Sequence, residues 1–416
     1  IQELKKKLES IEKAKSLLRK GVCVLKKKLK QSMDLNNEQK KQIEEDLLIE
    51  SALLGFFDKS INNKSTMNMK GCTIVGLVVG NAKLVHFGLD GYNRVFDDFF
   101  LKDGSTSQSV TYGLKTLLGF DGFHLAFRNY TDPDYYTPSD GQKSYKNFNI
   151  NKDTEYESLW QALMWCSYYD TSYPIIGDQS FGDFFPKDYY EFLTNEYKHD
   201  YIQEYIGSLQ NMQELPHNNG IFLRDPDYVP YDGVFSLPDM IYPYQQQGFI
   251  RSGEKGEESL LILDASPSDG GHHHYDSLNV IYTKYNNELL LDLGYLLDHP
   301  NKSKTMATSA HNTVVIDGSD QINIQRGGEF HIFDTTLKDT KVMQASSHPY
   351  SDADVYHRTL VQIEHEKGKN YVVDIFRSNG GSKRRELALH GPNNNYTLNK
   401  PFSFSTPYEV TYFNGY

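Results

Sequence analysis

Cysteine, long apolar runs and positive charge are all scarce in this 416-residue chain. The three cysteines, Cys23, Cys72 and Cys166, are too few and too scattered for a disulfide framework or a thiolate metal site. No apolar run approaches the roughly 18 residues of a membrane-spanning helix, so we expect no membrane span. A signal peptide is also missing from the sequence, and Ile1 falls inside an amphipathic pattern. We therefore expect that the natural amino terminus has been removed or left unresolved.

Acidic residues outnumber basic ones, 55 against 43, which gives a net charge of −12. This balance argues against nucleic acid as a partner and against a broadly cationic surface for a heavily sulfated polymer. Aromatic residues are abundant instead, with 30 tyrosines and 23 phenylalanines. Aromatic rings supply a large buried area and can also stack against sugars.

The pattern of apolar residues changes near residue 240. Helical spacing marks the segments 1–31, 38–58, 69–79, 110–118, 156–169 and 189–205. Strand-like alternation marks the segments 259–263, 277–283, 289–292, 313–316, 329–333, 358–364 and 370–376. We therefore predict an α+β chain with a helical domain over 1–240 and an antiparallel β-sandwich domain over 241–416.

Residues 270–321 contain the pattern most useful for chemistry. A triple histidine at 272–274 follows two glycines, Asp292 comes 18 residues after His274, and His311 comes 19 residues after Asp292. Imidazole and carboxylate groups on adjacent strands can bind zinc, so His274, Asp292 and His311 are candidate ligands. The same spacing also suits a hydrogen-bonded polar cluster, and the triple histidine also suits a surface loop.

The motifs around these residues follow a fixed order. Arg-Ser-Gly at 251–253 is followed by GGHHHYD at 270–276, LLLDLG at 289–294 and AHNTVVIDG at 310–318. In this order the chain resembles the heparinase II/III-like polysaccharide lyases over roughly residues 248 to 321. The resemblance implies an incomplete α/α toroid followed by an antiparallel β-sheet domain. It also implies a secreted or periplasmic protein.

Residue by residue, the resemblance gives the histidine cluster distinct roles. It implies that His274, Asp292 and His311 bind Zn²⁺ and that His272 faces the substrate. The zinc is expected to be structural and to order the loop that carries His272. Arg251 becomes a candidate for pairing with the substrate's charge, although a structural salt bridge suits it equally.

Two segments of the helical half resemble catalytic elements of the same family. The first, DGSTSQSVTYG at 103–113, implies that Tyr112 is the general acid and a candidate base. It departs from the family at Ser107-Gln108, where a Glu-Gly pair is frequent.

The second segment begins with Asn62-Asn63-Lys64 and continues to Asn68. The resemblance implies that Asn63 neutralises the substrate's carboxylate, with Asn62 and Asn68 as further candidates for substrate binding. Lys64 stands where some members have histidine. The alternative is structural, with Asn62-Asn63 as a turn and Asn68 as a helix cap.

These residue types suit β-elimination on an acidic polysaccharide. Such a reaction neutralises the carboxylate of a uronic acid, removes the proton at C5 and protonates the oxygen that leaves C4. Asparagine suits the first task, and tyrosine and histidine suit the other two. We therefore expect a polysaccharide lyase. Alginate, heparan-type and hyaluronan-type chains all remain open as substrates, as does the oligomeric state.

Three alternatives share some of these features. A uronyl C5-epimerase begins with the same proton removal but returns the proton on the other face of the sugar. A degenerate lyase would bind acidic polysaccharide without cleaving it. A metal-dependent hydrolase would use a zinc-bound water and give products without a double bond.

Overall fold

The computed structural model describes residues 35–139, 141–208, 236–253, 257–268, 271–285 and 287–392. The helix predicted over 1–31 lies outside these residues. The chain divides into two compact units, which are described separately: unit 1 comprises Ile1–Tyr173 and Phe184–Leu237, and unit 2 comprises Pro174–Asp183 and Pro238–Tyr416. Residues 174–183, which the sequence analysis places in the helical domain, thus group with the second unit.

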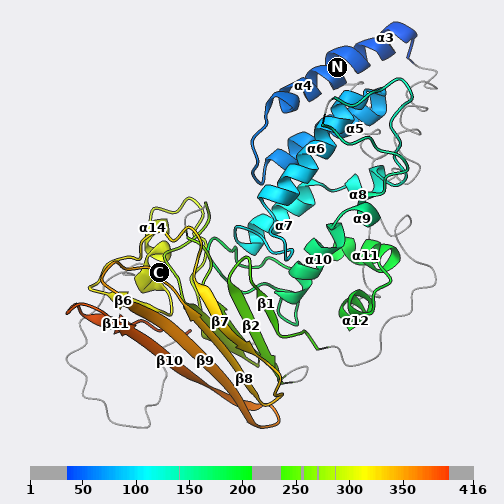
Figure 1. Cartoon of the computed structure of the whole chain (residues 1–416). Coiled ribbons are helices and arrows are strands. Elements are labelled where there is room, and N and C mark those ends of the chain that lie inside the picture. Colours follow the sequence, from blue (N-terminus) through cyan, green and yellow to red (C-terminus); the bar gives the residue numbers. More distant parts are fainter. Residues whose placement is uncertain are drawn as a thin grey trace. The chain divides into compact units, whose positions relative to one another are not determined.

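Unit 1 is helical (Figure 1). Its helices are α3 (Asn37–Gln42), η2 (Ile43–Ile49), α4 (Glu50–Phe57), α5 (Ser65–Val79), α6 (Ala82–Asp98), α7 (Val110–Gly119), α8 (Phe123–Ala126), α9 (Ile150–Asp153), α10 (Tyr156–Trp165), η3 (Lys187–Tyr189), α11 (Tyr190–Glu196) and α12 (Asp200–Ser208). All the predicted helical segments among the described residues overlap one or more of these helices.

The apolar pattern of the sequence does not predict α6, and two glycines explain why. Gly88 and Gly91 lower the helix propensity of this segment. Both lie where α6 packs closely on α5: an added Cβ at Gly88 would lie 1.4 Å from the Thr73 hydroxyl, and one at Gly91 would lie 2.5 Å from the Met69 sulfur. The glycines that weaken the local helical signal therefore permit the tertiary contact that stabilises the helix.

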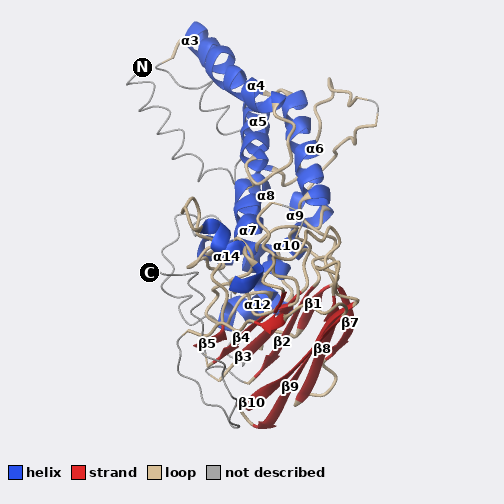
Figure 2. Ribbon diagram, turned by 90° about the vertical axis from the view of Figure 1, so that its left-hand side faces the viewer, coloured by secondary structure: helices blue, strands red, loops and turns tan. Residues whose placement is uncertain are grey.

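The described part of unit 2 contains three antiparallel sheets. Its strands are β1 (Met240–Tyr242), β2 (Gln247–Ser252), β3 (Ser259–Asp264), β4 (Asn279–Lys284), β5 (Asn287–Leu290), β6 (Val314–Ile316), β7 (Glu329–Asp334), β8 (Thr340–Ser346), β9 (Val355–Glu366), β10 (Lys369–Asn379) and β11 (Arg385–Leu387). The strand orders of the two larger sheets are β1-β2-β3-β4-β5 and β10-β9-β8-β7 (Figure 2). The third sheet pairs β11 with β6 (Figure 1). Two short helices, α14 (Lys302–Met306) and η5 (Thr308–Ala310), precede β6.

An apolar core joins the sheets of unit 2. It includes Leu261 and Leu263 of β3, Val314 of β6, and Tyr356 and Leu360 of β9. These side chains come from all the layers of a β-sandwich, in which inward-facing residues alternate along each strand. The predicted fold class, helices followed by antiparallel sheets, is confirmed. Among the described helices, none is long and apolar enough to cross a membrane.

Candidate functional site

The three predicted zinc ligands lie together in unit 2. His274 belongs to the loop before β4, Asp292 to the loop after β5, and His311 to the turn between η5 and β6. All three side chains are buried, and their possible ligand atoms lie within 4.8 Å of one another. Asp292 was expected at the end of a strand, but β5 ends two residues earlier, at Leu290.

Hydrogen bonds fix Asp292 within this cluster. The Nδ1 atom of His311 lies 2.8 Å from Asp292 Oδ2, and the Asn279 side chain donates to the same oxygen at 2.9 Å. The Gly294 N–H donates to Asp292 Oδ1 at 2.9 Å. Burial alone would raise the pKa of Asp292, but the charge and hydrogen bond of His311 lower it. Burial likewise opposes protonation of His311, but the Asp292 carboxylate raises its pKa to about 9.

The unused polar atoms of the cluster fit a metal ion. His274 Nδ1 and His311 Nε2 are buried and have no hydrogen-bond partner among the described residues. An unpaired buried polar atom is unfavourable, and a bound cation would satisfy it. Two imidazoles and one carboxylate are a ligand set that zinc accepts. His274, Asp292 and His311 therefore fit the single zinc ion that the family resemblance implies.

The residues that follow His311 attach it to the sandwich. The Asn312 side chain donates to the carbonyl oxygens of Val280 and Leu291, both at 2.9 Å, and its N–H donates to Asn279 Oδ1 at 2.9 Å. Arg358, which is fully buried in β9, donates to the carbonyl oxygen of Asn312. The sequence motif thus combines a candidate ligand with the residue that anchors its strand.

His272 lies beside the cluster in an uncommon backbone conformation. Its φ angle is +74°, a region that residues other than glycine enter rarely and often at functional sites. Its side chain is 27% exposed, and its Nδ1 lies 2.8 Å from Oδ2 of Asp178. The other oxygen of Asp178 lies 3.0 Å from Nε2 of His274. Asp178 therefore links His272 to a member of the candidate metal cluster, and a role of His272 toward the substrate stays a prediction.

Asp178 is a member of this site that no sequence motif predicts. Burial alone would raise its pKa, but the hydrogen bonds with His272 and His274 hold it well below the usual range. Asp178 precedes His272 by 94 residues and lies in a loop of the helical half of the sequence. No local pattern marks it, and only the grouping of residues 174–183 with unit 2 places it here.

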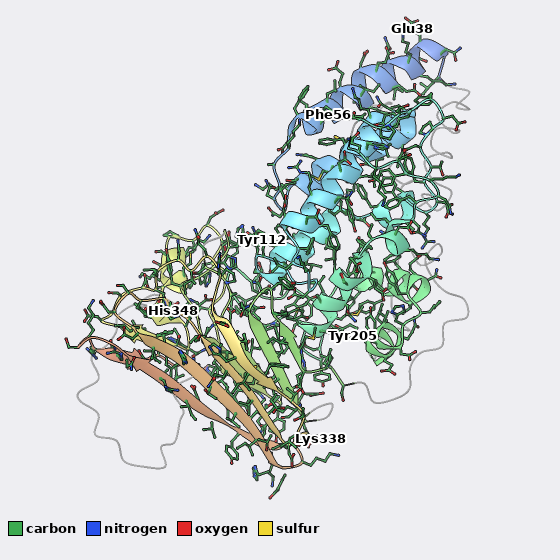
Figure 3. All side chains as sticks on the ribbon, in the orientation of Figure 1. Glu38, Phe56, Tyr112, Tyr205, Lys338 and His348 are labelled. Carbon is green, nitrogen blue, oxygen red and sulfur yellow. The ribbon has the colours of Figure 1, made fainter. Side chains whose placement is uncertain are left out.

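Tyr112 lies in unit 1, near the start of α7 (Figure 3). Its side chain is 8% exposed, and Lys115 Nζ lies 5.2 Å from the centre of its ring. The preceding loop packs tightly on α7, because a Cβ at Gly113 would lie 2.2 Å from the methyl carbon of Thr106. This contact fixes the start of the helix that carries Tyr112.

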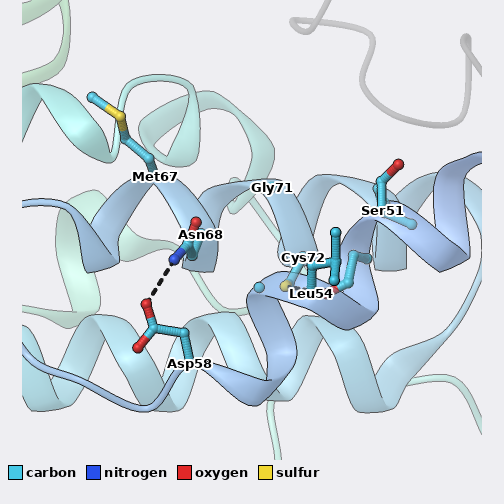
Figure 4. Close-up of a pocket in the computed structure, with 10 residues that line it drawn as sticks. Ser51, Leu54, Asp58, Met67, Asn68, Gly71 and Cys72 are labelled. Atoms are coloured by element: carbon cyan, nitrogen blue, oxygen red, sulfur yellow. Dashed lines mark hydrogen bonds between the residues drawn. The ribbon is translucent and has the colours of Figure 1, made fainter.

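The three candidate asparagines of unit 1 have different environments. Asn62 Oδ1 accepts hydrogen bonds from the N–H groups of Lys64 at 2.8 Å and Ser65 at 3.2 Å, which supports the start of α5. Asn68 donates to Asp58 at 3.0 Å and lines a pocket of about 330 Å³ between α4 and α5 (Figure 4). Asn63 is half-buried, and its side-chain amide has no hydrogen-bond partner within the described part of the chain. Only Asn63 is thus not already committed to a local structural contact.

Arg251 lies in β2 and is 4% exposed. Its N–H donates to Asp239 at 2.7 Å, and its Nε donates to the carbonyl oxygen of Pro238 at 3.2 Å. These contacts attach the segment before β1 to the sheet. A role in substrate binding stays a prediction for this residue.

Comparison of this chain with known proteins gives both a sequence match and structural matches. Residues 241–405 match the family model described as heparinase II/III-like, C-terminal. No curated protein matches the sequence.

Three solved structures show the same fold at low sequence identity. Heparan sulfate lyase HepC from Pedobacter heparinus has a TM-score of 0.55 and 14% identity, over 80% of this chain and 48% of that one. A heparinase III with methylated lysines has a TM-score of 0.60 and 14% identity, over 83% and 49% of the two chains. Another heparinase III has a TM-score of 0.58 and 11% identity, over 88% and 55%.

The chain therefore spans about half the length of the solved structures that it matches. At these identities the structural similarity establishes the fold alone. The family match, in contrast, covers the sandwich strands and all three candidate zinc ligands. The resemblance to the heparinase II/III-like family, first indicated by the ordered motifs, is thus confirmed for the carboxy-terminal domain of this chain.

Proposed function

We propose that this chain acts in a polysaccharide lyase that cleaves a uronic-acid-containing polysaccharide by β-elimination. The observation that carries the proposal is the arrangement around Asp178. It links His272, which is partly exposed and held in a left-handed backbone conformation, to His274 of the buried cluster. A partly exposed imidazole with fixed orientation beside a rigid polar cluster suits a group that transfers protons.

In the proposed reaction a base removes the C5 proton while the C4–O bond breaks. The electron pair of the C5–H bond forms the C4=C5 double bond, and the departing oxygen takes a proton from an acid. His272 is proposed to remove the C5 proton or to bind the carboxylate, depending on the C5 epimer. Tyr112 is proposed as the acid, and it can also serve as the base.

Asn63 is proposed to bind the uronate carboxylate. Its side-chain N–H group donates to an anion without introducing a charge, and so stabilises the negative charge that builds up when the C5 proton leaves. Among the three candidates it alone keeps its amide free within the described residues, whereas Asn62 and Asn68 donate to or accept from neighbouring groups. This difference supports Asn63.

His274, Asp292 and His311 would hold a zinc ion. When bound, zinc would cross-link the loops before β4, after β5 and before β6, which is a structural contribution. Since His274 is two residues from His272, loss of the ion would act on catalysis indirectly. The resemblance also supports a secreted or periplasmic location, where such an enzyme would encounter acidic polysaccharides.

The test is ultraviolet absorbance by unsaturated uronate ends, measured on a panel of uronic acid polysaccharides. The parent chain should raise the absorbance with at least one polymer, and Tyr112→Phe should abolish the rise. Tyr371→Phe, which removes a hydroxyl from an exposed tyrosine of β10, should leave it unchanged. No rise on any polymer would contradict the lyase. Exchange of the C5 proton into heavy water would then identify an epimerase.

A further inference from the structure

Asp178 contacts two histidines that have different proposed tasks. Its Oδ2 lies 2.8 Å from His272 Nδ1, and its Oδ1 lies 3.0 Å from His274 Nε2. We propose that Asp178 is a positioning residue that fixes both the orientation and the tautomer of these two rings at once. This inference rests on the proposed function, in which His272 faces the substrate and His274 holds zinc.

The chemistry of the carboxylate sets the tautomers. An ionised carboxylate offers only acceptors, so the ring nitrogen that faces each oxygen must carry a hydrogen. A neutral imidazole carries a hydrogen on one nitrogen only. His272 is therefore left with a lone pair on Nε2, and His274 with a lone pair on Nδ1. One side chain thus holds two neighbouring histidines in opposite tautomers.

The second ring nitrogen of each histidine is the one that its proposed task needs. His274 Nδ1 is buried and unpaired among the described residues, as a metal-binding nitrogen is before the ion enters. The His272 side chain is 27% exposed, and its Nε2 is the ring nitrogen that this tautomer assigns to the substrate side. A hydrogen bond from the second imidazole nitrogen to a carboxylate is a common way to orient both metal ligands and catalytic bases.

Main-chain contacts hold Asp178 against His272. The Asp178 N–H donates to the His272 carbonyl oxygen at 3.2 Å, which supports the left-handed conformation of His272. Gly177 has a φ angle of +57°, and a Cβ at this position would lie 2.9 Å from the same carbonyl oxygen. Glycine is therefore needed here for both the backbone conformation and the close approach.

The other side of the segment is held by the loop that follows Asp292. The Tyr295 N–H donates to the Gln179 carbonyl oxygen at 3.2 Å. Lys302 Nζ lies 3.6 Å from Asp178 Oδ2 and 4.5 Å from the centre of the Tyr295 ring. The positive charge of Lys302 therefore balances the negative charge of the Asp178 carboxylate. Residues 174–183 are thus fixed to both loops that supply the candidate ligands, although they precede those loops by about a hundred residues.

Asp178→Asn is the sharpest variant, because it keeps the shape and changes one acceptor into a donor. The amide oxygen can accept from one imidazole, whereas the amide nitrogen faces the other ring with a donor. One histidine must then change its tautomer or turn away. Asp298→Asn makes the same chemical change at an exposed position of unit 2 and serves as the control.

Long-range ¹H–¹⁵N spectra of the histidine rings report the tautomers directly. The parent should show His272 with hydrogen on Nδ1 and His274 with hydrogen on Nε2, with the signals assigned from His272→Gln. Asp178→Asn should change one of them, whereas Asp298→Asn should change neither. Finding the same tautomer for both rings of the parent would overturn the proposal, whether or not the variant folds.

Zinc affinity gives a second readout that needs no substrate. Competition with a chromophoric chelator should show affinity for zinc about 10- to 100-fold weaker in Asp178→Asn than in the parent. Parental affinity together with parental tautomers in this variant would contradict the positioning role. Both readouts remain decisive if the chain proves inactive as a lyase, so failure of the proposed function and failure of this inference are distinguishable.

Discussion

The Nδ1 atom of His311 and the Oδ2 atom of Asp292 lie 2.8 Å apart, and both side chains are completely buried. A buried ion pair gains little net stability unless its remaining polar atoms also find partners. Here the second ring nitrogen of His311 has none among the described residues, and neither has Nδ1 of His274. The pair therefore forms part of a cluster that a cation would complete.

We predict that the chain binds about one zinc ion through this cluster. His311→Ala should lower the zinc content about tenfold or more, as measured by elemental analysis after dialysis. His273→Ala removes the adjacent histidine, which lies outside the cluster, and should retain the metal. Chelation should also lower the unfolding temperature of the parent but not that of His311→Ala. Equal zinc content in both alanine variants would contradict the assignment.

Arg358 is predicted to be a main contributor to the stability of unit 2. It is fully buried, pairs through Nε and Nη2 with the two oxygens of Asp374, and donates to the carbonyl oxygens of Leu278 and Asn312. Arg358→Met leaves these acceptors unpaired, so we expect the free energy of unfolding to fall by about 3 kcal/mol or more.

A matched control lies in the same pair of strands. Lys369 and Glu366 form an ion pair whose side chains are 61% and 62% exposed. Lys369→Met should change the free energy of unfolding by less than about 0.5 kcal/mol, because solvent screens exposed pairs. Denaturant-induced unfolding measures both variants, and similar losses in the two would show that burial of Arg358 is not what makes it stabilising.

The two predicted asparagine roles can be separated by comparing stability with turnover. Asn63→Ala should lower turnover about 100-fold or more with little change in stability, because its amide is proposed to bind the carboxylate. Asn62→Ala should lower the free energy of unfolding by about 1 kcal/mol, because Asn62 supports the start of α5, and it should leave turnover intact. The opposite result would transfer the role of neutraliser to Asn62.

His124 is predicted to make unit 1 sensitive to acid. It is buried, and its ring lies 4.3 Å from that of Phe192. Burial lowers its pKa from 6.5 to about 4, with smaller opposed effects of Asp121 and Arg128. At a pH between these two pKa values, His124 binds a proton in the unfolded chain but stays neutral in the folded chain. The stability contributed by neutral His124 is therefore present above about pH 6.5 and is lost as the pH falls toward 4.

The loss across this range should amount to about 3 kcal/mol. It is measured as the pH dependence of the free energy of unfolding, and His124→Gln should flatten that dependence between pH 6.5 and 4. His199→Gln is the control, since the side chain of His199 is 60% exposed. An unchanged slope in His124→Gln would refute the account of this residue.

The parts of the site that the sequence could predict are those encoded in local motifs. His274, Asp292 and His311 each lie in a short recognisable segment of one strand-rich region, and the structure brings all three together. Asp178 lies in a loop of the helical half, and its role depends on a tertiary contact that leaves no local pattern. Asn63 and Tyr112 could be proposed only through the family resemblance.

The same limit applies to the fold. The predicted strands of unit 2 follow the alternation of apolar residues, and each overlaps an observed strand. β8, which was not predicted, has the sequence TKVMQAS, whose polar residues obscure that alternation. It is nevertheless held between β7 and β9, and its Met343 and Ala345 lie in the core. Pairing with neighbouring strands, rather than its own pattern, determines its structure.

The mass of the products tests the central claim most directly. The protein is incubated with a uronic acid oligosaccharide that it cleaves, and the products are weighed by mass spectrometry. The masses of the two fragments should sum to the mass of the uncleaved oligosaccharide, and one fragment should carry an unsaturated uronate. This result follows from β-elimination, in which no water is added. Fragments whose summed mass exceeds that of the uncleaved oligosaccharide by one water would instead show hydrolysis, and would contradict the proposed lyase.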